Sequence, residues 1–107
     1  MNQGDIFWRS FPAPDKARPV VILTRQRAIP VLTSVTVAPI TSSIRGIRSQ
    51  VVVGTEHGLK ATSAVSLDNV QTVRKERLSD FVAHLPDSVL REIRDALQFA
   101  LGLDKLG

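Results

Sequence analysis

The residues best suited to chemistry are an arginine, two hydroxyls and a carboxylate placed near the ends of expected strands. Arg18 directly precedes a proline and a run of branched apolar residues, Thr41 and Ser42 follow another apolar stretch, and Asp68 lies between two short strand-like segments. Guanidinium and hydroxyl groups together suit a phosphate, which accepts bidentate donors and hydroxyl hydrogen bonds. These residues therefore form a candidate phosphate site. The alternative interpretation is that Arg18 is an ordinary charge flanking a strand.

Other kinds of catalytic site find less support. The chain has no cysteine, which excludes disulfides, thiolate metal sites and cysteine nucleophiles. No glycine-rich phosphate loop and no metal-ligand spacing is present, so we expect neither a metal nor a cofactor. His84 stands in an expected strand, which favours a structural role, whereas His57 stands in a loop where it could touch a ligand. A Ser–His–Asp triad stays open, although no nucleophile-elbow sequence supports it.

The elements that must position these groups are short strands followed by one helix. The run after Arg18 is typical of a central strand buried on both faces. Apolar residues recurring at three- and four-residue steps from Val89 to Leu101 predict an amphipathic helix, which begins near Pro86 and ends at Gly102. The strands are expected over residues 6–8, 18–24, 31–39, 50–54, 63–67 and 70–73, with 81–85 as a further candidate. Residues 41–49 read as a mobile basic loop.

One helix cannot cover both faces of such a sheet. We therefore expect a mainly β fold with a C-terminal helix, as a small barrel or a strongly curled sheet. Either the sheet closes on itself or a second copy of the chain covers the remainder. The 107 residues suit a single domain spanning 1–107. No apolar run is long enough to cross a membrane and no signal peptide is visible, which makes a soluble cytoplasmic protein the expectation.

The charge distribution suggests a polyanionic partner. The net charge is +4; residues 1–60 carry eight Lys/Arg against three Asp/Glu, whereas residues 61–107 carry six against seven. A basic first half favours nucleic acid as the partner. The alternative is that modest basicity merely aids solubility.

Five segments, in their order and spacing, resemble the MazF/PemK family of toxins. They are Gly4-Asp5-Ile6, Arg18-Pro19-Val20-Val21-Ile22, residues 37–42, residues 63–73 and Leu101-Gly102-Leu103. The resemblance covers essentially the whole chain. It implies an SH3-like barrel with an appended helix, acting as a homodimer. It further implies a bacterial toxin of a type II toxin–antitoxin pair that cleaves single-stranded RNA, including mRNA, at a short sequence without a metal, and so inhibits translation and growth.

The resemblance also assigns roles to residues. Arg18 stands at the family's catalytic arginine, Thr41 at its catalytic hydroxyl with Ser42 beside it, and Asp68 near an acid that some relatives carry. In RNA self-cleavage the 2′-hydroxyl attacks phosphorus, giving a 2′,3′-cyclic phosphate and a 5′-hydroxyl. Arg18 would stabilise the developing charge or protonate the leaving oxygen, because free guanidinium is a poor base. The base is unassigned, and Asp68 is a weaker candidate.

Outlying cations would bind the RNA backbone, and loops 11–17 and 41–49 would read splayed bases. These cations are Lys16, Arg25, Arg27, Arg45 and Arg48. Solvated surface charge is the alternative for each. An acidic antitoxin would occupy the same basic channel and exclude RNA. Two rival functions use the same fold: a CcdB-like toxin that binds DNA gyrase without cleaving RNA, and a plain nucleic-acid-binding SH3-like module.

Overall fold

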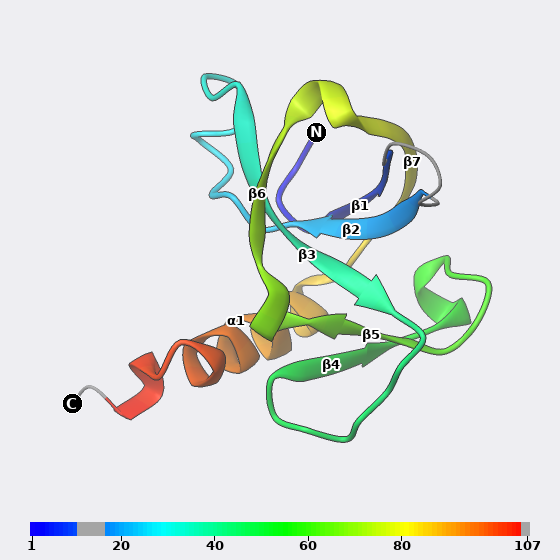
Figure 1. The fold of residues 1–107 in the computed structure, drawn as a ribbon, viewed down its shortest axis with the longest axis vertical. Coiled ribbons are helices and arrows are strands. Elements are labelled where there is room, and N and C mark those ends of the chain that lie inside the picture. Colours follow the sequence, from blue (N-terminus) through cyan, green and yellow to red (C-terminus); the bar gives the residue numbers. More distant parts are fainter. Residues whose placement is uncertain (11–16, 106–107) are drawn as a thin grey trace.

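The computed structural model describes residues 1–10 and 17–105, and these residues form seven strands and one α-helix (Figure 1). The predicted fold class, mainly β with a C-terminal helix, is confirmed. Short 3₁₀ turns at residues 55–57, 67–69, 75–77 and 103–105 complete the described secondary structure. The elements are β1 (Asp5–Arg9), β2 (Arg18–Ile22), β3 (Ser34–Thr41), β4 (Gln50–Val53), β5 (Ser63–Ser66), β6 (Gln71–Arg74), β7 (Leu78–His84) and α1 (Asp87–Ala100).

The strands pair antiparallel in the order β4-β5-β3-β2-β1-β7, and β6 pairs with the first half of β3. The strand that begins at Arg18 is central, as its apolar run predicts. From β6 the chain passes through one 3₁₀ turn into β7, and the Ser10 N–H at the end of β1 donates to the Arg77 carbonyl of that turn at 3.0 Å. No ladder joins β6 to β7 in the described residues, so the sheet curls into an open barrel and does not close (Figure 1).

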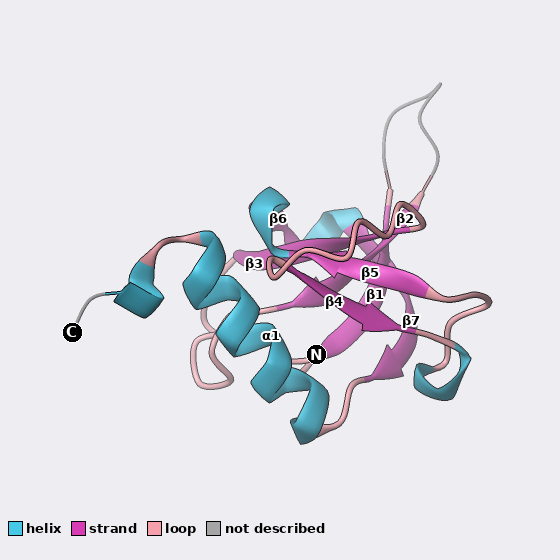
Figure 2. Cartoon of the chain, turned by 90° about the horizontal axis from the view of Figure 1, so that it is seen from below, coloured by secondary structure: helices cyan, strands magenta, loops and turns pink. Residues whose placement is uncertain are grey.

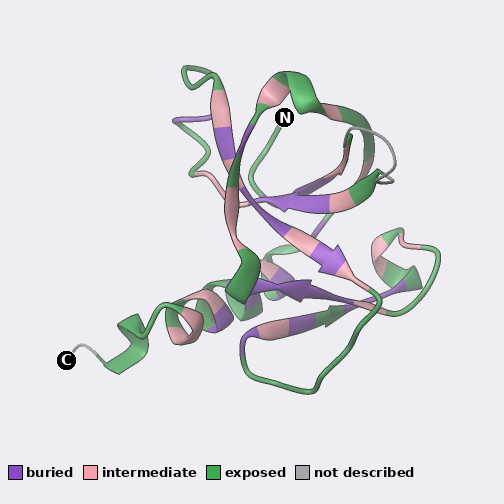
Figure 3. Ribbon diagram, in the orientation of Figure 1, coloured by how far each residue is buried: buried purple, intermediate pink, exposed green. Residues whose placement is uncertain are grey.

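Two apolar clusters follow from the two-residue period of the strands. In β2, Val20 and Ile22 point to one face and Val21 to the other. The inner cluster fills the curled sheet and contains Val20, Ile22, Ile29, Val35, Val37 and Val73. The helix-side cluster covers the other face and contains Ile6, Val21, Ala38, Ile40, Val51, Val53, Val65, Leu67, Leu85, Val89, Ile93 and Ala96. Figure 3 shows buried residues recurring along the central strands.

Helix α1 packs its apolar stripe on the helix-side cluster, alongside the sheet (Figure 2). Val89, Ile93 and Ala96 are its buried residues. Leu90, Leu97 and Ala100 pack partly buried against the same cluster, which confirms the predicted period within the helix. Leu101 follows the helix and is exposed, so the end of the predicted stripe is wrong. Asp87 lies in the first turn, where a negative charge favours the helix dipole. Gly102 follows with φ of +72°, a conformation that glycine adopts without strain. No helix within residues 1–10 and 17–105 is long and apolar enough to span a membrane.

The predicted boundaries of β3 are wrong at both ends. The expected strand 31–39 is instead Ser34–Thr41, because residues before it turn so that Ile29 enters the inner cluster. The sequence predicts that the strand ends at Pro39, whereas in the structure Pro39 lies within β3, opposite Val20. On its other side β3 pairs with β6 up to Val37 and with β5 from Ile40. The missing N–H of Pro39 therefore falls where β3 changes partner, and no ladder bond is lost there.

Candidate active site

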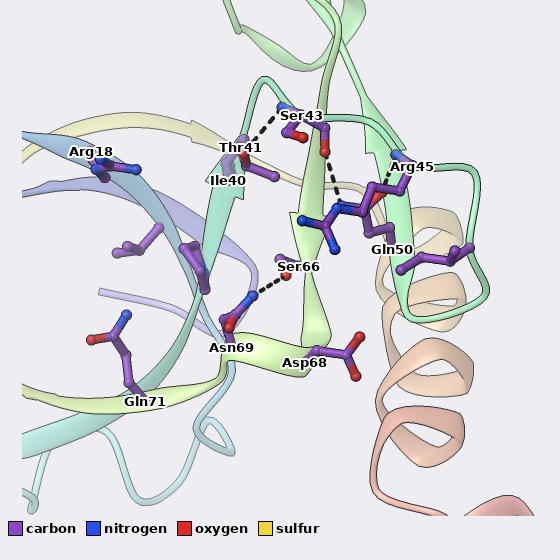
Figure 4. A pocket seen from close by; sticks show the side chains of 13 residues that line it. Arg18, Ile40, Thr41, Ser43, Arg45, Gln50, Ser66, Asp68, Asn69 and Gln71 are labelled. Atoms are coloured by element: carbon purple, nitrogen blue, oxygen red, sulfur yellow. Dashed lines mark hydrogen bonds between the residues drawn. The ribbon is translucent and has the colours of Figure 1, made fainter.

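Arg18 and Thr41 stand at neighbouring ends of the two central strands. Val20 pairs with Pro39. This pair is the last of the ladder between β2 and β3, and Arg18 and Thr41 each stand two residues beyond it, with their side chains apart in Figure 4. Because side chains alternate between faces, both point to the side of Val20 and Pro39, which is the concave side of the curled sheet. Arg18 and Thr41 are far apart in the sequence, and two adjacent strands bring them to the same side of the sheet.

Both residues line a cavity of about 610 Å³ at the mouth of the open barrel (Figure 4). Its walls come from the start of β2, the end of β3, the loop after β3, the start of β4 and the turn between β5 and β6. Asp68, the third kind of group predicted for the site, lines it as well. The remaining lining residues are Val20, Pro39, Ile40, Ser43, Arg45, Ile47, Gln50, Ser66, Asn69 and Gln71.

The hydroxyl of Thr41 has a fixed acceptor role and a proton to give. Its Oγ1 accepts the backbone N–H of Ser43 at 3.1 Å, a local turn that orients the side chain (Figure 4). The hydroxyl hydrogen can then be donated to an anion in the cavity. Arg18 is exposed at the first position of β2, and its guanidinium brings up to five further donors. One charged and one neutral donor thus face the same volume.

Asp68 lies in the 3₁₀ turn that links β5 to β6. Its Oδ2 accepts the Ser49 hydroxyl at 2.5 Å, and Ser49 is itself buried. This bond anchors the carboxylate while Oδ1 remains available as an acceptor. Asp68 is the sole carboxylate among the described residues that line the cavity. The position therefore suits a group that accepts a proton or a ribose hydroxyl bond.

The loop after β3 is held against the cavity by Gln50. The Gln50 Oε1 accepts the Arg45 N–H at 2.8 Å, and its Nε2 donates to the Ser43 carbonyl at 3.1 Å. The Gln50 side chain thus holds residues 43–45 by two hydrogen bonds, although this segment pairs with none of the described strands. Arg45, one of the predicted RNA-binding cations, is brought into the cavity wall by this arrangement.

Other predicted site residues lie elsewhere. Ser42 points to the opposite face from Thr41 and lines a second hollow of about 470 Å³ with Trp8, Pro19, Ile40, Phe81 and others. Arg48 places its guanidinium 4.2 Å from the centre of the Phe99 ring and 3.7 Å from an oxygen of Asp104. Arg25 and Arg27 are exposed in the loop that leaves the other end of β2. Lys16 and most of loop 11–17 lie outside the described residues.

Neither histidine lines the cavity. His57, predicted as a loop residue that could touch a ligand, accepts the Gly54 N–H on Nδ1 at 3.2 Å within its own turn. His84 lies 2.8 Å from a carboxylate oxygen of buried Asp5, whose other oxygen accepts the Asn2 N–H at 2.7 Å. This contact ties the N-terminus to the end of β7. Within the described part of the chain no three His, Cys, Asp or Glu side chains gather so as to hold a metal ion.

Sequence reasoning missed the amides of the site. Gln50, Asn69 and Gln71 line the cavity, and Gln71 accepts a hydrogen bond from Arg9 at 2.9 Å. The available signal was positional. Arg9 and Gln71 each stand two residues from an apolar side chain of the inner cluster, Phe7 and Val73, and so point to the same concave face. Finding them required knowing which strand ends share the mouth of the barrel.

Comparisons with known proteins identify the family. Residues 2–101 match the sequence profile described as PemK-like, MazF-like toxin of type II toxin-antitoxin system. Endoribonuclease MazF3 of Mycobacterium tuberculosis is 44% identical over 90 residues, covering 84% of this chain and 87% of that protein. Probable endoribonuclease MazF5 of the same organism is 39% identical over 102 residues, covering 92% of this chain and 91% of that protein.

The fold agrees with a solved structure at similar identity. Mycobacterium tuberculosis toxin MazF-mt6 superposes with a TM-score of 0.86 at 41% identity, covering 94% of this chain and 98% of that chain. The likeness thus extends over the sheet, the C-terminal helix and the strands that form the cavity. With a family profile over nearly the whole sequence, the chain belongs to the PemK-like, MazF-like toxins of type II toxin–antitoxin systems.

Proposed function

We propose that the chain is an endoribonuclease that cleaves single-stranded RNA, mRNA included, at a short sequence and so inhibits translation and growth. One observation carries this function. The Arg18 guanidinium and the Thr41 hydroxyl converge on one cavity from adjacent strands, with a single anchored carboxylate, Asp68, in the wall. The family profile and relatives named endoribonuclease support the same activity. A gyrase-binding toxin or a plain binding module would have no use for this convergence, so neither is favoured.

The reaction needs charge stabilisation, alignment and two proton transfers. The ribose 2′-oxygen forms a bond to phosphorus while the bond from phosphorus to the 5′-oxygen breaks, leaving a 2′,3′-cyclic phosphate and a 5′-hydroxyl. We assign stabilisation of the developing negative charge on the phosphate to Arg18, a charged preorganised donor that contributes about 3–4 kcal/mol. Thr41 adds a neutral hydroxyl donor, which contributes about 0.5–1.5 kcal/mol. Asp68 accepts the 2′-hydroxyl proton in this scheme, and Arg18 or water supplies one to the 5′-oxygen. No metal ion is called on.

The remaining cations divide by position. Arg45 lies in the cavity wall and would bind an RNA phosphate there. Arg48 lies over Phe99 and near Asp104, and we give it an outer place on the RNA path. Arg25 and Arg27 would bind RNA that extends past the far end of β2, and Lys16 RNA near loop 11–17. Ser42 faces the second hollow, where it would support the cut only by shaping the turn beside Thr41.

Because a constitutive ribonuclease would harm its own cell, we infer that an acidic antitoxin binds the toxin, in keeping with the toxin–antitoxin family. We place the reaction in the cytoplasm, where mRNA is found, and expect a single functional domain that acts as a homodimer. The antitoxin would cover the arginine-bearing mouth and exclude RNA. A competition titration tests this occlusion, and a stable ternary complex with uncleaved RNA still in the cavity would refute it.

The decisive experiment incubates the purified chain with a long single-stranded RNA in EDTA. We expect discrete fragments that carry a 2′,3′-cyclic phosphate and begin with a 5′-hydroxyl. Replacing the ribose at the cut by deoxyribose removes the nucleophile and should abolish cleavage. Intact RNA that remains bound to the protein would transfer support to the binding module, and efficient cutting of the deoxy substrate would refute the mechanism.

A further inference from the structure

A polar contact crosses the mouth of the open barrel next to the candidate active site. Arg9 is the last residue of β1 and pairs with Arg18 on β2. Gln71 is the first residue of β6 and pairs with Val37 on β3. The Arg9 Nη1 donates to Gln71 Oε1 at 2.9 Å. Since β2 and β3 lie between β1 and β6 in the sheet, this bond spans the concave face.

The contact fixes which way the Gln71 amide faces. A guanidinium has only donors, so the atom of Gln71 that meets Arg9 must be the amide oxygen. The amide nitrogen therefore points away from Arg9. Figure 4 shows that nitrogen directed towards the other side chains that line the cavity. With its oxygen engaged by Arg9, Gln71 presents N–H donors to the cavity.

A hydrogen-bond donor held in one orientation binds some bases and disfavours others. It can hydrogen-bond a carbonyl oxygen, such as O4 of uracil or O6 of guanine. At the same point cytosine carries the amino group N4 and adenine the amino group N6. An amino group that faces the Gln71 N–H leaves both donors desolvated and without an acceptor, which is unfavourable. An amide that could rotate would satisfy either kind of base edge. The rigidity that Arg9 imposes is what turns Gln71 into a discriminating group.

This inference rests on the proposed ribonuclease function. We propose that Gln71 reads a keto-bearing base, uracil or guanine, at one position beside the cut. Arg9 is the positioning residue that holds the Gln71 amide in the donor orientation. Arg9 does not itself line the cavity, so it acts through Gln71. The sequence preference then depends on β6 as well as on the loops.

The surroundings of Gln71 suit a base more than a phosphate. Thr41 lies four residues beyond Val37, the partner of Gln71, which is about 13 Å along β3. That span places Gln71 beyond the phosphate bound by Arg18 and Thr41 and within reach of a neighbouring nucleotide. Between them the concave face presents Val20 and Pro39, apolar groups on which the flat face of a base can pack.

The test measures base preference rather than activity alone. The cleavage site of the wild-type chain is first mapped on a randomised single-stranded RNA pool. Four oligonucleotides are then compared at each position beside the cut, differing only in that base. We expect uracil and guanine to be favoured over cytosine and adenine by about tenfold in kcat/KM at one position, the size of one well-placed hydrogen bond.

Three variants separate reading from scaffolding. Gln71→Glu replaces the donor with an acceptor and should invert the ratio towards cytosine and adenine, even though its charge slows cleavage of all four. Arg9→Leu frees the amide to rotate and should bring the ratio close to one. Arg9→Lys keeps a donor for the Gln71 oxygen and should restore most of the wild-type ratio. Thermal melting of each variant shows whether it is folded under the assay conditions.

The outcomes that overturn the inference are distinct from those that overturn the function. A wild-type chain that cuts no RNA refutes the proposed function and this inference with it. A wild-type chain that cuts, while Gln71→Glu keeps the same base profile or loses rate equally for all four bases, refutes the inference alone. A folded Arg9→Leu variant with an unchanged base ratio would show that Arg9 only closes the mouth of the barrel.

Discussion

Thr41 and Ser42 are adjacent in sequence yet belong to different hollows. Thr41 faces the cavity at the barrel mouth, whose lining includes two arginines, a carboxylate and three amides. Ser42 faces a hollow whose lining is mostly apolar, including Trp8, Leu59 and Phe81. The two hollows lie on opposite sides of the same strands. Their difference shows that strand alternation, rather than nearness in sequence, decides which hydroxyl can meet Arg18.

The same contrast extends along the strands. On the concave side, the residues that continue the inner cluster to the mouth are Arg9, Arg18, Thr41 and Gln71, all polar. On the other side, the residues that continue the helix-side cluster include Trp8 and Pro19. A curled sheet brings concave side chains together and spreads convex ones apart. The concave mouth is therefore where separate strand ends can act on one phosphate.

The strongest way to break this comparison is to remove the charged donor. Arg18→Ala should lower the rate of RNA cleavage by about 10²–10³-fold, as for loss of one preorganised donor to an oxyanion. Because Arg18 is exposed, the melting temperature should stay near that of the wild-type chain. Single-turnover cleavage of a fixed oligonucleotide measures the rate.

The matched control for this prediction is Ser42→Ala, which changes a polar residue in the other hollow. We expect it to cleave RNA at a rate within about twofold of wild type, because Ser42 faces away from the cavity. Its free energy of unfolding should change by less than about 0.5 kcal/mol, as is usual for a surface substitution. Wild-type cleavage by a folded Arg18→Ala variant would remove Arg18 from the mechanism. A loss by Ser42→Ala equal to that of Arg18→Ala would show that the two hollows act as one.

The carboxylate comes next in expected effect. If Asp68 accepts the 2′-hydroxyl proton, Asp68→Asn should lower the cleavage rate by about 10²-fold, at the low end of general-base effects. Asn keeps the size and can still accept the Ser49 hydroxyl bond, so the turn should remain folded. Glu92→Gln on the exposed side of α1 is the control for loss of one negative charge. Equal rates for the two variants would leave the base with another group or water.

Much of the fold was predictable because its signals are local. The run after Arg18 marked the central strand, and the period from Val89 to Leu101 marked the helix. The limits of β3 were not predictable, since Pro39 is tolerated only through a change of partner strand that depends on β5 and β6. A proline ends a strand by local rules, and tertiary pairing overrides them here.

The site divides in the same way. Arg18, Thr41 and Asp68 stood out because of their chemistry at strand ends and the family resemblance, and the fold brings them to one cavity. Arg9 and Gln71 carried no motif, and their contact joins residues 62 positions apart. Only the curl of the sheet, a property of the whole chain, reveals that their strand ends meet.

The neutral hydroxyl offers a finer test of the two faces. Thr41→Val removes the hydroxyl but keeps the shape, and we expect up to about tenfold slower cleavage, because a neutral hydrogen bond contributes about 0.5–1.5 kcal/mol. Thr41→Ser should retain most of the activity. Ser42→Val makes the equivalent change one residue along and should have little effect. If Ser42→Val lowered the cleavage rate as much as Thr41→Val, this would contradict the placement of Thr41 and Ser42 on opposite faces of the sheet.

The smallest expected effect separates two cations of one loop. Arg45 lines the cavity, whereas Arg48 is engaged by Phe99 and Asp104. Arg45→Gln should weaken RNA binding several-fold and reduce the slope of log affinity against log salt by about 0.7, the value for one phosphate contact on a single strand. Arg48→Gln should reduce that slope by a smaller amount, because we give Arg48 only an outer place on the RNA path.

The main effect of Arg48→Gln should be on folding. Losing the contact with the Phe99 ring should lower the free energy of unfolding by about 0.5–1 kcal/mol, the usual range for an exposed cation–π pair. Urea unfolding measures the change in the free energy of unfolding. Salt titrations of RNA binding measure the slope of log affinity against log salt, and they use proteins that also carry Arg18→Ala, so that the RNA is not cleaved. If Arg48→Gln changed the salt slope as much as Arg45→Gln, the RNA would have to bend around the loop to the end of α1. Arg48 would then contact an RNA phosphate as directly as Arg45 does.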